Sequence, residues 1–207
     1  MQNKFSLDHP IVKKSFNIID QEVGQHNFST LEYQIVRRII HSTADFEFIN
    51  LLKFSPTAID NGINSLRNNI PIITDVTMVK QGIVNLVSKT FKNPIITAIE
   101  KAPDALPGKT RTETGLLQCY KEYPQGIYVI GNAPTALLAL CQQIEEKKLK
   151  PCLIIGVPVG FISVLESKRV LREIDVPQIR VEGRKGGSPV AAAIINALLI
   201  LAFESDV

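Results

Sequence analysis

The sequence lacks most of the features that mark a specialised class of protein. It has no tryptophan and only three cysteines among 207 residues. Cys119, Cys141 and Cys152 show neither CxxC nor metal-ligand spacing, and each falls in an apolar run. We therefore expect free, buried thiols and no metal site, which fits a reducing compartment. The first ten residues also lack the apolar stretch of a secretory signal, so the sequence favours the cytoplasm.

An excess of one charge and a long hydrophobic run are missing as well. The chain has 23 Lys and Arg against 20 Asp and Glu, a formal net charge of +3. A nucleic-acid-binding domain normally carries a basic stripe, so no nucleic acid is expected. The most apolar stretch, Val190–Phe203, is interrupted by Asn196 and is shorter than a usual membrane span. We interpret it as a buried helix and expect no membrane partner. A weak basic bias is compatible with an acidic small-molecule ligand.

The hydrophobic periodicity changes at about residue 70. Residues from about 9 to 69 show helical periodicity and almost no strand pattern, with helices expected from Ile11, over Thr30–Thr43 and after Pro56. Short β-branched runs then alternate with helical segments, which favours an α/β fold with a mostly parallel sheet and helices on both faces. Residues 1–207 are interpreted as one domain. The five expected strands are Ile70–Thr74, Pro94–Ile99, Gly126–Ile130, Pro151–Val157 and Gln178–Val181, and the later helices lie near Thr112–Tyr123, Thr135–Lys148, Ser163–Ile174 and Pro189–Phe203.

The turns after the expected strands carry residues suited to ligand binding. Ligands of open parallel sheets bind outside the carboxyl ends of the strands. Glycine lets the backbone approach a ligand closely, and helix N-termini offer N–H groups to anions. Tight turns also need glycine for structural reasons alone, but three glycine-bearing turns on one edge of the sheet favour an anionic ligand. None matches the dinucleotide fingerprint or the Walker pattern. The turns are Thr74–Met78, Gly131–Thr135, Gly156–Gly160 and Gly183–Pro189.

One histidine has a setting unlike the other two. His41 lies three residues after Arg38 and seven after Gln34, which places the three on one face of a helix. Histidine readily exchanges a proton near neutral pH. The structural alternative is an ordinary histidine near a helix C-terminus. Arg111 is likewise either a solvated loop charge or a carboxylate clamp. These residues alone do not define a reaction.

At these residues the chain resembles the precorrin-8X methylmutase family over nearly its whole length. The segment Ser42–Asp45 departs from many relatives, which have Ala-Cys-Gly or Thr-Ser-Gly types of segment there, but the histidine before it is kept. The last three of the similar segments are the most specific. In chain order the segments are Lys14–Phe16, Val36–His41, Phe54–Pro56, Thr74–Val79, Thr110–Thr112, Gly131–Leu137, Gly156–Phe161 and Gly183–Ser188.

The resemblance implies an isomerase of cobalamin biosynthesis. Its substrate is a tetrapyrrole with several carboxylates, precorrin-8X or its cobalt form, on which a methyl group migrates to give hydrogenobyrinic or cobyrinic acid. It also implies a parallel α/β fold and a homodimer. A rearrangement needs no cofactor, and none is expected. The resemblance assigns proton donation and acceptance to His41, and substrate contact to Ser15 and Arg38. The turns add as substrate-binding candidates Asp75, Met78, Thr110, Arg111, Asn132, Thr135, Gly160, Arg184, Gly187 and Ser188.

Other interpretations fit parts of the pattern. A non-catalytic tetrapyrrole carrier would need the same binding groups but no proton donor at His41. A nucleotide-binding enzyme would use Gly183–Ser188 as a phosphate loop, but the Lys-Ser/Thr ending is missing. The helix Pro189–Phe203 is apolar on nearly every face, which favours a dimer, unless it is sandwiched within its own subunit. The sequence does not say whether the substrate carries cobalt.

Overall fold

Six strands form one sheet in the computed structural model, which describes residues 9–204. The strand order is β1-β6-β5-β4-β2-β3, and every neighbouring pair is parallel except β1 and β6. The predicted α/β fold with a mostly parallel sheet is confirmed, although the sheet has one strand more than expected. The strands are β1 (Leu52–Phe54), β2 (Ile72–Thr74), β3 (Ile95–Thr97), β4 (Ile127–Ile130), β5 (Leu153–Gly156) and β6 (Gln178–Val181).

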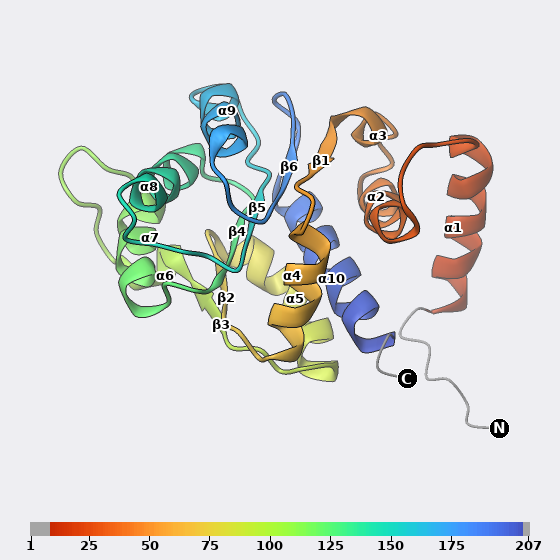
Figure 1. Ribbon diagram of the computed structural model, residues 1–207, viewed down its shortest axis with the longest axis horizontal. Helices are drawn as coiled ribbons and strands as arrows, with labels where there is room; N and C mark the ends of the chain where they lie inside the picture. The colour runs from red at the N-terminus through yellow and green to blue at the C-terminus, as the bar shows by residue number, and fades with distance from the viewer. Residues whose placement is uncertain (1–8, 205–207) are drawn as a thin grey trace.

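Helices cover both faces of this sheet (Figure 1). The side chains of Ile72 and Ile127 belong to a core shared with α4, α5 and α10, whereas the adjacent Ile73 and Tyr128 belong to a second core under α6 to α9. This follows from the alternation of side chains along a strand. The helices are α1 (Pro10–Val23), α2 (Thr30–Thr43), α3 (Phe48–Leu51), α4 (Ala58–Arg67), α5 (Thr77–Lys89), α6 (Ala98–Lys101), α7 (Arg111–Glu122), α8 (Pro134–Glu145), α9 (Val164–Glu173) and α10 (Ser188–Glu204).

The expectation of an N-terminal region without strands is wrong at β1. This strand pairs antiparallel with β6, with Lys53 opposite Arg180. Three residues are too few to show a period of two, and the strand is stabilised by its partner rather than by its own sequence. Helix α5 was also missing from the expected elements. It buries Val79, Ile83 and Val87, but no side chain caps its N-terminus.

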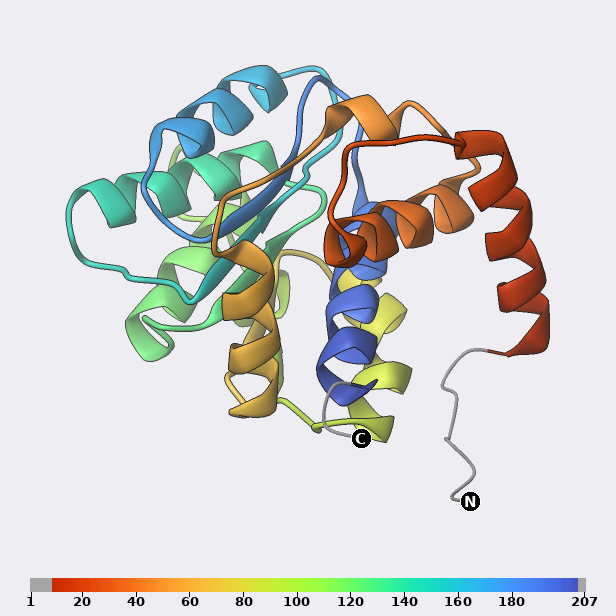
Figure 2. The ribbon, with the colours of Figure 1, turned by 45° about the vertical axis from the view of Figure 1, so that its right-hand side comes forward.

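Helix α10 occupies the centre of the molecule. Its outer face packs on α2 and its other faces on α4, α5 and the sheet, while α1 packs on α2 further out (Figure 2). Ala191, Ile194 and Leu198 are completely buried. The helix is therefore sandwiched within its own subunit, and its apolar faces are not evidence for a partner chain. Between residues 9 and 204, no helix is long and apolar enough to cross a membrane.

The sheet has one topological switch point, between β2 and β4. From β2 the chain adds β3 on one side, and it then returns to add β4, β5 and β6 on the other. Open α/β sheets bind ligands in the crevice at such a point, outside the carboxyl ends of the strands. The first residues of α5, α8 and α10 all lie at this edge, because each helix follows a parallel strand.

Close packing of α6 against α7 gives a test of this arrangement. A Cβ at Gly115 would lie 1.7 Å from the carbonyl oxygen of Ala98. We expect Gly115→Ala to lower the free energy of unfolding by about 1–3 kcal/mol, because overpacking outweighs the higher helix propensity of alanine. Urea denaturation measures this difference. The control Gln118→Ala, at an exposed position of the same helix, is expected to stay within about 0.5 kcal/mol. Equal stability of Gly115→Ala and the unmodified chain would contradict the packing.

Candidate active site

Helix α2 carries the histidine that the sequence singled out. Ser29 and Glu32 form a capping box at its start, in which each side chain accepts the N–H of the other residue. The apolar stripe that includes Ile35 and Ile39 is completely buried. His41 lies beside this stripe, so its ring is exposed while the helix itself is firmly held.

His41 forms part of the wall of two hollows. The first has a volume of about 270 Å³ and lies between α2, α5 and the first half of α10. The second has a volume of about 260 Å³ and lies between α1 and the end of α2. Arg38 lines the first hollow with His41, and Ser15 lines the second. The structure thus brings together three residues that were predicted to act on the substrate.

Phe16 of α1 contacts the charged face of α2. Its ring meets the ring of His41 edge-on, with centroids 5.4 Å apart and planes at 77°. The guanidinium carbons of Arg37 and Arg38 lie 4.3 and 5.3 Å from the centre of the same ring. Arginine on an aromatic face is an attractive arrangement. Phe16 is 7% exposed, and it limits the positions that the His41 ring and the Arg38 guanidinium can adopt. The segment Lys14–Phe16 was noted for its resemblance to the family, but this role of Phe16 was not predicted, because an apolar residue on a helix is normally interpreted as core.

At the switch point, Asp75 holds the loop after β4. It is completely buried, and one of its oxygens accepts the N–H groups of Asn132 and Ala133 at 2.6 and 2.9 Å. Burial raises the pKa of Asp75 above its ordinary value, although four backbone N–H groups oppose this effect. The expectation of direct substrate contact is corrected here, since no face of Asp75 is open. The exposed side chain is that of Asn132.

Two predicted threonines meet at the starts of α7 and α8. The Oγ1 atoms of Thr110 and Thr135 are 3.0 Å apart, and Thr110 also caps α7 by accepting the N–H of Glu113. The guanidinium of Arg111 donates to the carbonyl oxygen of Ala102 at 3.1 Å. Part of its donor capacity therefore holds the segment after β3, which reduces what it can offer as a carboxylate clamp.

The loops after β5 and β6 lie against each other. The N–H of Gly187 donates to the carbonyl of Val157 at 2.8 Å, and that of Gly160 donates to Arg184 at 3.4 Å. Gly187 and Ser188 are buried, whereas the Arg184 side chain is exposed. A Cβ at Gly131 would lie 3.1 Å from Cα of Ser188, so the loop after β4 reaches the same place. Met78, another predicted contact, is 66% exposed at the start of α5.

Lys185 ties the loop after β6 to the end of the histidine helix. Its ammonium group lies 2.6 Å from a carboxylate oxygen of Asp45 and 3.0 Å from one of Glu47. The hydrogen bond from Lys185 lowers the pKa of Asp45 below its ordinary value. Asp45, which follows the end of the histidine helix, thus takes part in an ion pair that connects this helix with the carboxyl edge of the sheet.

A hollow of about 400 Å³ lies at the opposite, amino ends of the strands. It is larger than either hollow beside His41, and Lys147, Lys148 and Lys150 are among the residues that line it. None of the predicted substrate-binding residues reaches it. Parallel sheets bind their ligands at the other edge, so the His41 side is the candidate site despite the smaller volumes of its hollows.

Comparison with known proteins identifies the family. The model of the precorrin-8X methylmutase family matches residues 10–201. The chain belongs to the precorrin-8X methylmutase family. It is 59% identical to the cobalt-precorrin-8 methylmutase of Synechocystis sp., over 96% of this chain and 98% of that protein. It is 39% identical to the cobalt-precorrin-8 methylmutase of Leptospira interrogans, over 97% of each.

A solved structure agrees with this identification. The precorrin-8X methylmutase of Thermus thermophilus superimposes with a TM-score of 0.86 at 39% identity, over 95% of this chain and 97% of that one. The family expected from the sequence is confirmed, and so is its activity class, a methyl-migrating isomerase of cobalamin biosynthesis. The carrier and nucleotide-binding alternatives are not favoured.

The Lys185 ion pair gives a prediction on pH. The depressed pKa of Asp45 means that the pair stabilises the fold above the ordinary carboxyl pKa of 3.8 and that this contribution is lost as the pH falls through the folded-state pKa. Asp45→Asn should therefore cost at most about 1 kcal/mol of unfolding free energy at pH 7, a modest value because the pair is partly exposed. The difference should decrease once the pH falls below 3.8, as the carboxylate takes up a proton. Urea denaturation from pH 7 to pH 2 measures it, and a difference that persists unchanged at pH 2 would contradict the assignment.

Proposed function

We propose that His41 is the acid–base residue of the methyl migration. The observation that carries this proposal is the position of His41 in the wall of both hollows, with Arg38 in one and Ser15 in the other. The imidazolium donates a proton to the bound macrocycle, which makes the ring electron-poor and lets the methyl group migrate between neighbouring carbons. The imidazole then takes a proton back as the product forms. One residue serves both steps, and a general acid of this kind contributes about 100- to 10,000-fold.

The substrate carboxylates require cationic and N–H donors around this histidine. We assign them to Arg38, to Arg184 and to the backbone of the Gly183–Ser188 loop. Arginine suits carboxylates because it donates two parallel hydrogen bonds. Asn132, Thr110 and Thr135 offer further polar contacts from the neighbouring loops. The contact with Phe16 keeps Arg38 and the His41 ring oriented toward the same ligand.

The cobalt form is the substrate that the relatives favour. The Synechocystis protein, at 59% identity, is named a cobalt-precorrin-8 methylmutase. We therefore propose cobalt-precorrin-8 rather than metal-free precorrin-8X as the physiological substrate. Here the cobalt is part of the substrate and is held by the ring nitrogens.

We also propose that the chain works as one domain in a cytoplasmic homodimer. Helix α10 packs on α2 as well as on the sheet, which joins the two parts of the chain. The three cysteines are free, as in a reducing compartment.

Phe161 and Ile162 are 85% and 86% exposed, and large apolar side chains so exposed are typical of interaction surfaces. Each hollow beside His41 is smaller than typical ligand pockets of about 300–1,000 Å³. A second copy covering them would enclose a large macrocycle.

The variant His41→Ala tests the chemical role. Its turnover of cobalt-precorrin-8, followed by absorbance, is expected to fall at least about a hundredfold. Its affinity for the product is expected to stay within about threefold of the unmodified value, because the carboxylate contacts remain. His26→Ala, which removes an imidazole from the segment between α1 and α2, is the control and should retain turnover. Unmodified turnover in His41→Ala would remove this residue from the mechanism.

The molecular mass of the protein in solution tests the proposed dimer. Light scattering at micromolar concentration is expected to give twice the chain mass of 22.9 kDa. Ile162→Asp should yield monomers, because a charge in an apolar interface is left without a partner. Leu106→Asp places the same charge at another exposed apolar position and should leave the dimer intact. A monomeric mass for the unmodified chain would overturn the proposal.

A further inference from the structure

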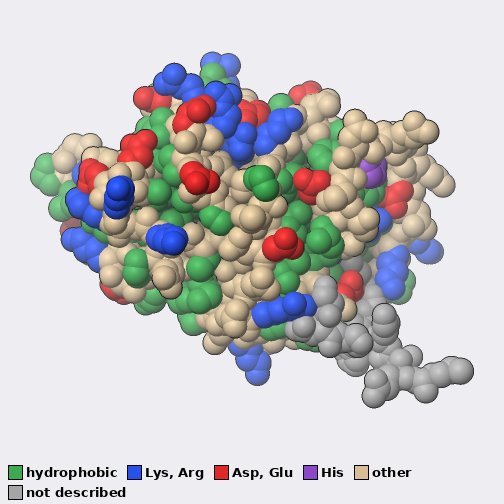
Figure 3. All heavy atoms as spheres, in the orientation of Figure 1, with side chains coloured by type: hydrophobic (Ala, Val, Ile, Leu, Met, Phe, Trp, Pro, Cys, Tyr) green, Lys and Arg blue, Asp and Glu red, His purple; other side chains and the backbone are tan. Residues whose placement is uncertain are grey.

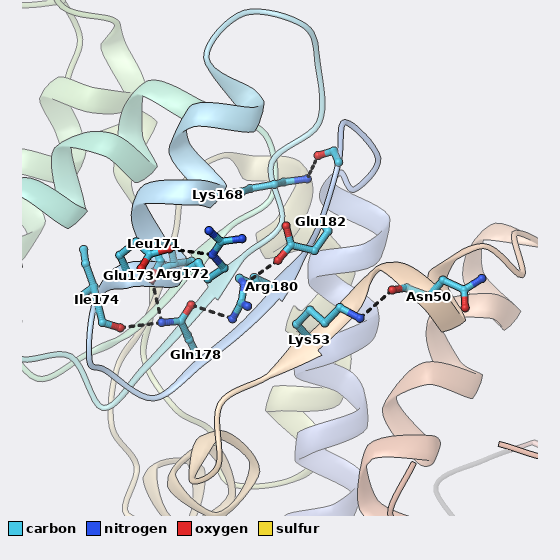
Figure 4. A network of polar contacts seen from close by, with 11 residues as sticks. Asn50, Lys53, Lys168, Leu171, Arg172, Glu173, Ile174, Gln178, Arg180 and Glu182 are labelled. Carbon is cyan, nitrogen blue, oxygen red and sulfur yellow. Dashed lines mark hydrogen bonds and ion pairs between the residues drawn. The ribbon is translucent and has the colours of Figure 1, made fainter. Parts of the chain in front are cut away.

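Lys168 on α9 is a buried lysine with no place in the chemistry described above. It is 1% exposed, although it lies on a helix whose neighbouring Arg169 and Arg172 are exposed. Figure 4 shows its side chain extending from α9 to the backbone of the loop that follows β6. A buried ammonium group is costly unless its N–H groups are satisfied. Its partners therefore reveal what this lysine does.

Two carbonyl groups of one loop accept these hydrogen bonds. The Nζ atom lies 2.8 Å from the oxygen of Gly183 and 2.7 Å from that of Lys185. Burial lowers the pKa of Lys168 to about 8, and the charge of Glu182 opposes this effect. The group is thus predominantly an ammonium at pH 7. Hydrogen bonds from a charged donor are about twice as strong as neutral ones.

These two bonds determine the direction of the adjacent N–H groups. In a planar trans peptide the C=O and N–H bonds point in opposite directions. Because the oxygens of Gly183 and Lys185 face Lys168, the N–H groups of Arg184 and Gly186 point away from it. Neither N–H donates to a protein acceptor within residues 9–204. Two N–H groups without an acceptor in this part of the chain, beside the exposed Arg184 side chain, are available to bind a carboxylate.

The other side of the loop is fixed as well. A Cβ at Gly186 would lie 2.3 Å from the carbonyl oxygen of Val157, and Gly186 has a φ of 149°. No side chain fits between the loop and the end of β5 at this position. The loop is thus held between the Val157 backbone and the Lys168 ammonium.

We infer that Lys168 is a positioning residue, which orients the Gly183–Ser188 loop so that the N–H groups of Arg184 and Gly186 bind one carboxylate of the tetrapyrrole. The identity of this ligand rests on the proposed function. The orientation of the loop by Lys168 is independent of the proposed function. Lys168 itself does not touch the substrate.

The test is Lys168→Met, which fills a similar volume without the donors. Arg172→Met, on the same helix, is the matched control, and its guanidinium forms an ion pair with Glu173. The first measurement is the rate of trypsin cleavage after Arg184 and Lys185, detected by mass spectrometry. We expect at least about a tenfold increase in Lys168→Met, because cleavage follows the population of the open loop and two charged hydrogen bonds are lost. The melting temperature should change by no more than about 4 °C. Arg172→Met should be cleaved at the unmodified rate.

The second measurement is ligand affinity, with hydrogenobyrinic acid titrated by absorbance. We expect the Kd to rise about tenfold in Lys168→Met, the effect of losing a charged hydrogen bond, with kcat within about threefold. A general structural defect would lower kcat and stability instead. If Lys168→Met does not fold, Gly186→Ala takes its place, because it displaces the loop from the other side. It should likewise raise the Kd about tenfold and leave kcat within about threefold.

Each result decides one part of the inference. An unchanged rate of trypsin cleavage in Lys168→Met and in Gly186→Ala would overturn the orientation of the loop by Lys168. Faster cleavage with an unchanged Kd would overturn carboxylate binding by the loop N–H groups. If the unmodified chain neither binds hydrogenobyrinic acid nor turns over cobalt-precorrin-8, the proposed function fails, and the cleavage rates still decide the role of Lys168.

Discussion

The packing of α10 between α2 and the sheet determines how the N-terminal helices are joined to the α/β part of the molecule. Because α10 is apolar on nearly all faces, it must be covered on all of them, and α2 provides the outer cover. This contact places α2, a helix of the N-terminal region, at the carboxyl edge of the sheet. His41 consequently lies beside the start of α10, where the first hollow contains both His41 and Pro189. The proposed acid–base residue is thus adjacent to the edge proposed to bind the substrate carboxylates.

Side chains other than the proposed substrate contacts hold the candidate site together. Asp75 fixes the loop after β4, and Lys185 joins the loop after β6 to the end of α2. Phe16 orients two residues of α2 from a different helix. Such supporting groups are needed because a catalytic arrangement fails when it is displaced by about 1 Å. The role of Asp75 also accounts for a buried carboxyl group that a purely apolar core would exclude.

The sequence predicts elements whose signal is local. The strands β4 and β5 are apolar runs, and β6 alternates polar and β-branched residues. All three have Gly or Pro near their ends, and they were found within about two residues. β1 was not found, because three residues gain strand character only from pairing with β6. The residues of the candidate site also differ in whether a local pattern in the sequence reveals them. His41 and Arg38 share a helix face that spacing reveals, whereas the contact between Phe16 and His41 joins residues 25 positions apart on two helices. The burial of Asp75 likewise depends on a loop distant in the sequence.

We propose that His41 and the carboxyl-edge loops form one tetrapyrrole site. A crystal structure with hydrogenobyrinic acid bound would show whether they do. We expect the macrocycle to lie against His41, with carboxylates within hydrogen-bond distance of Arg38 and of the N–H groups in the Gly183–Ser188 loop. Product bound instead in the hollow at the amino ends of the strands, against Lys147 and Lys150, would contradict this account.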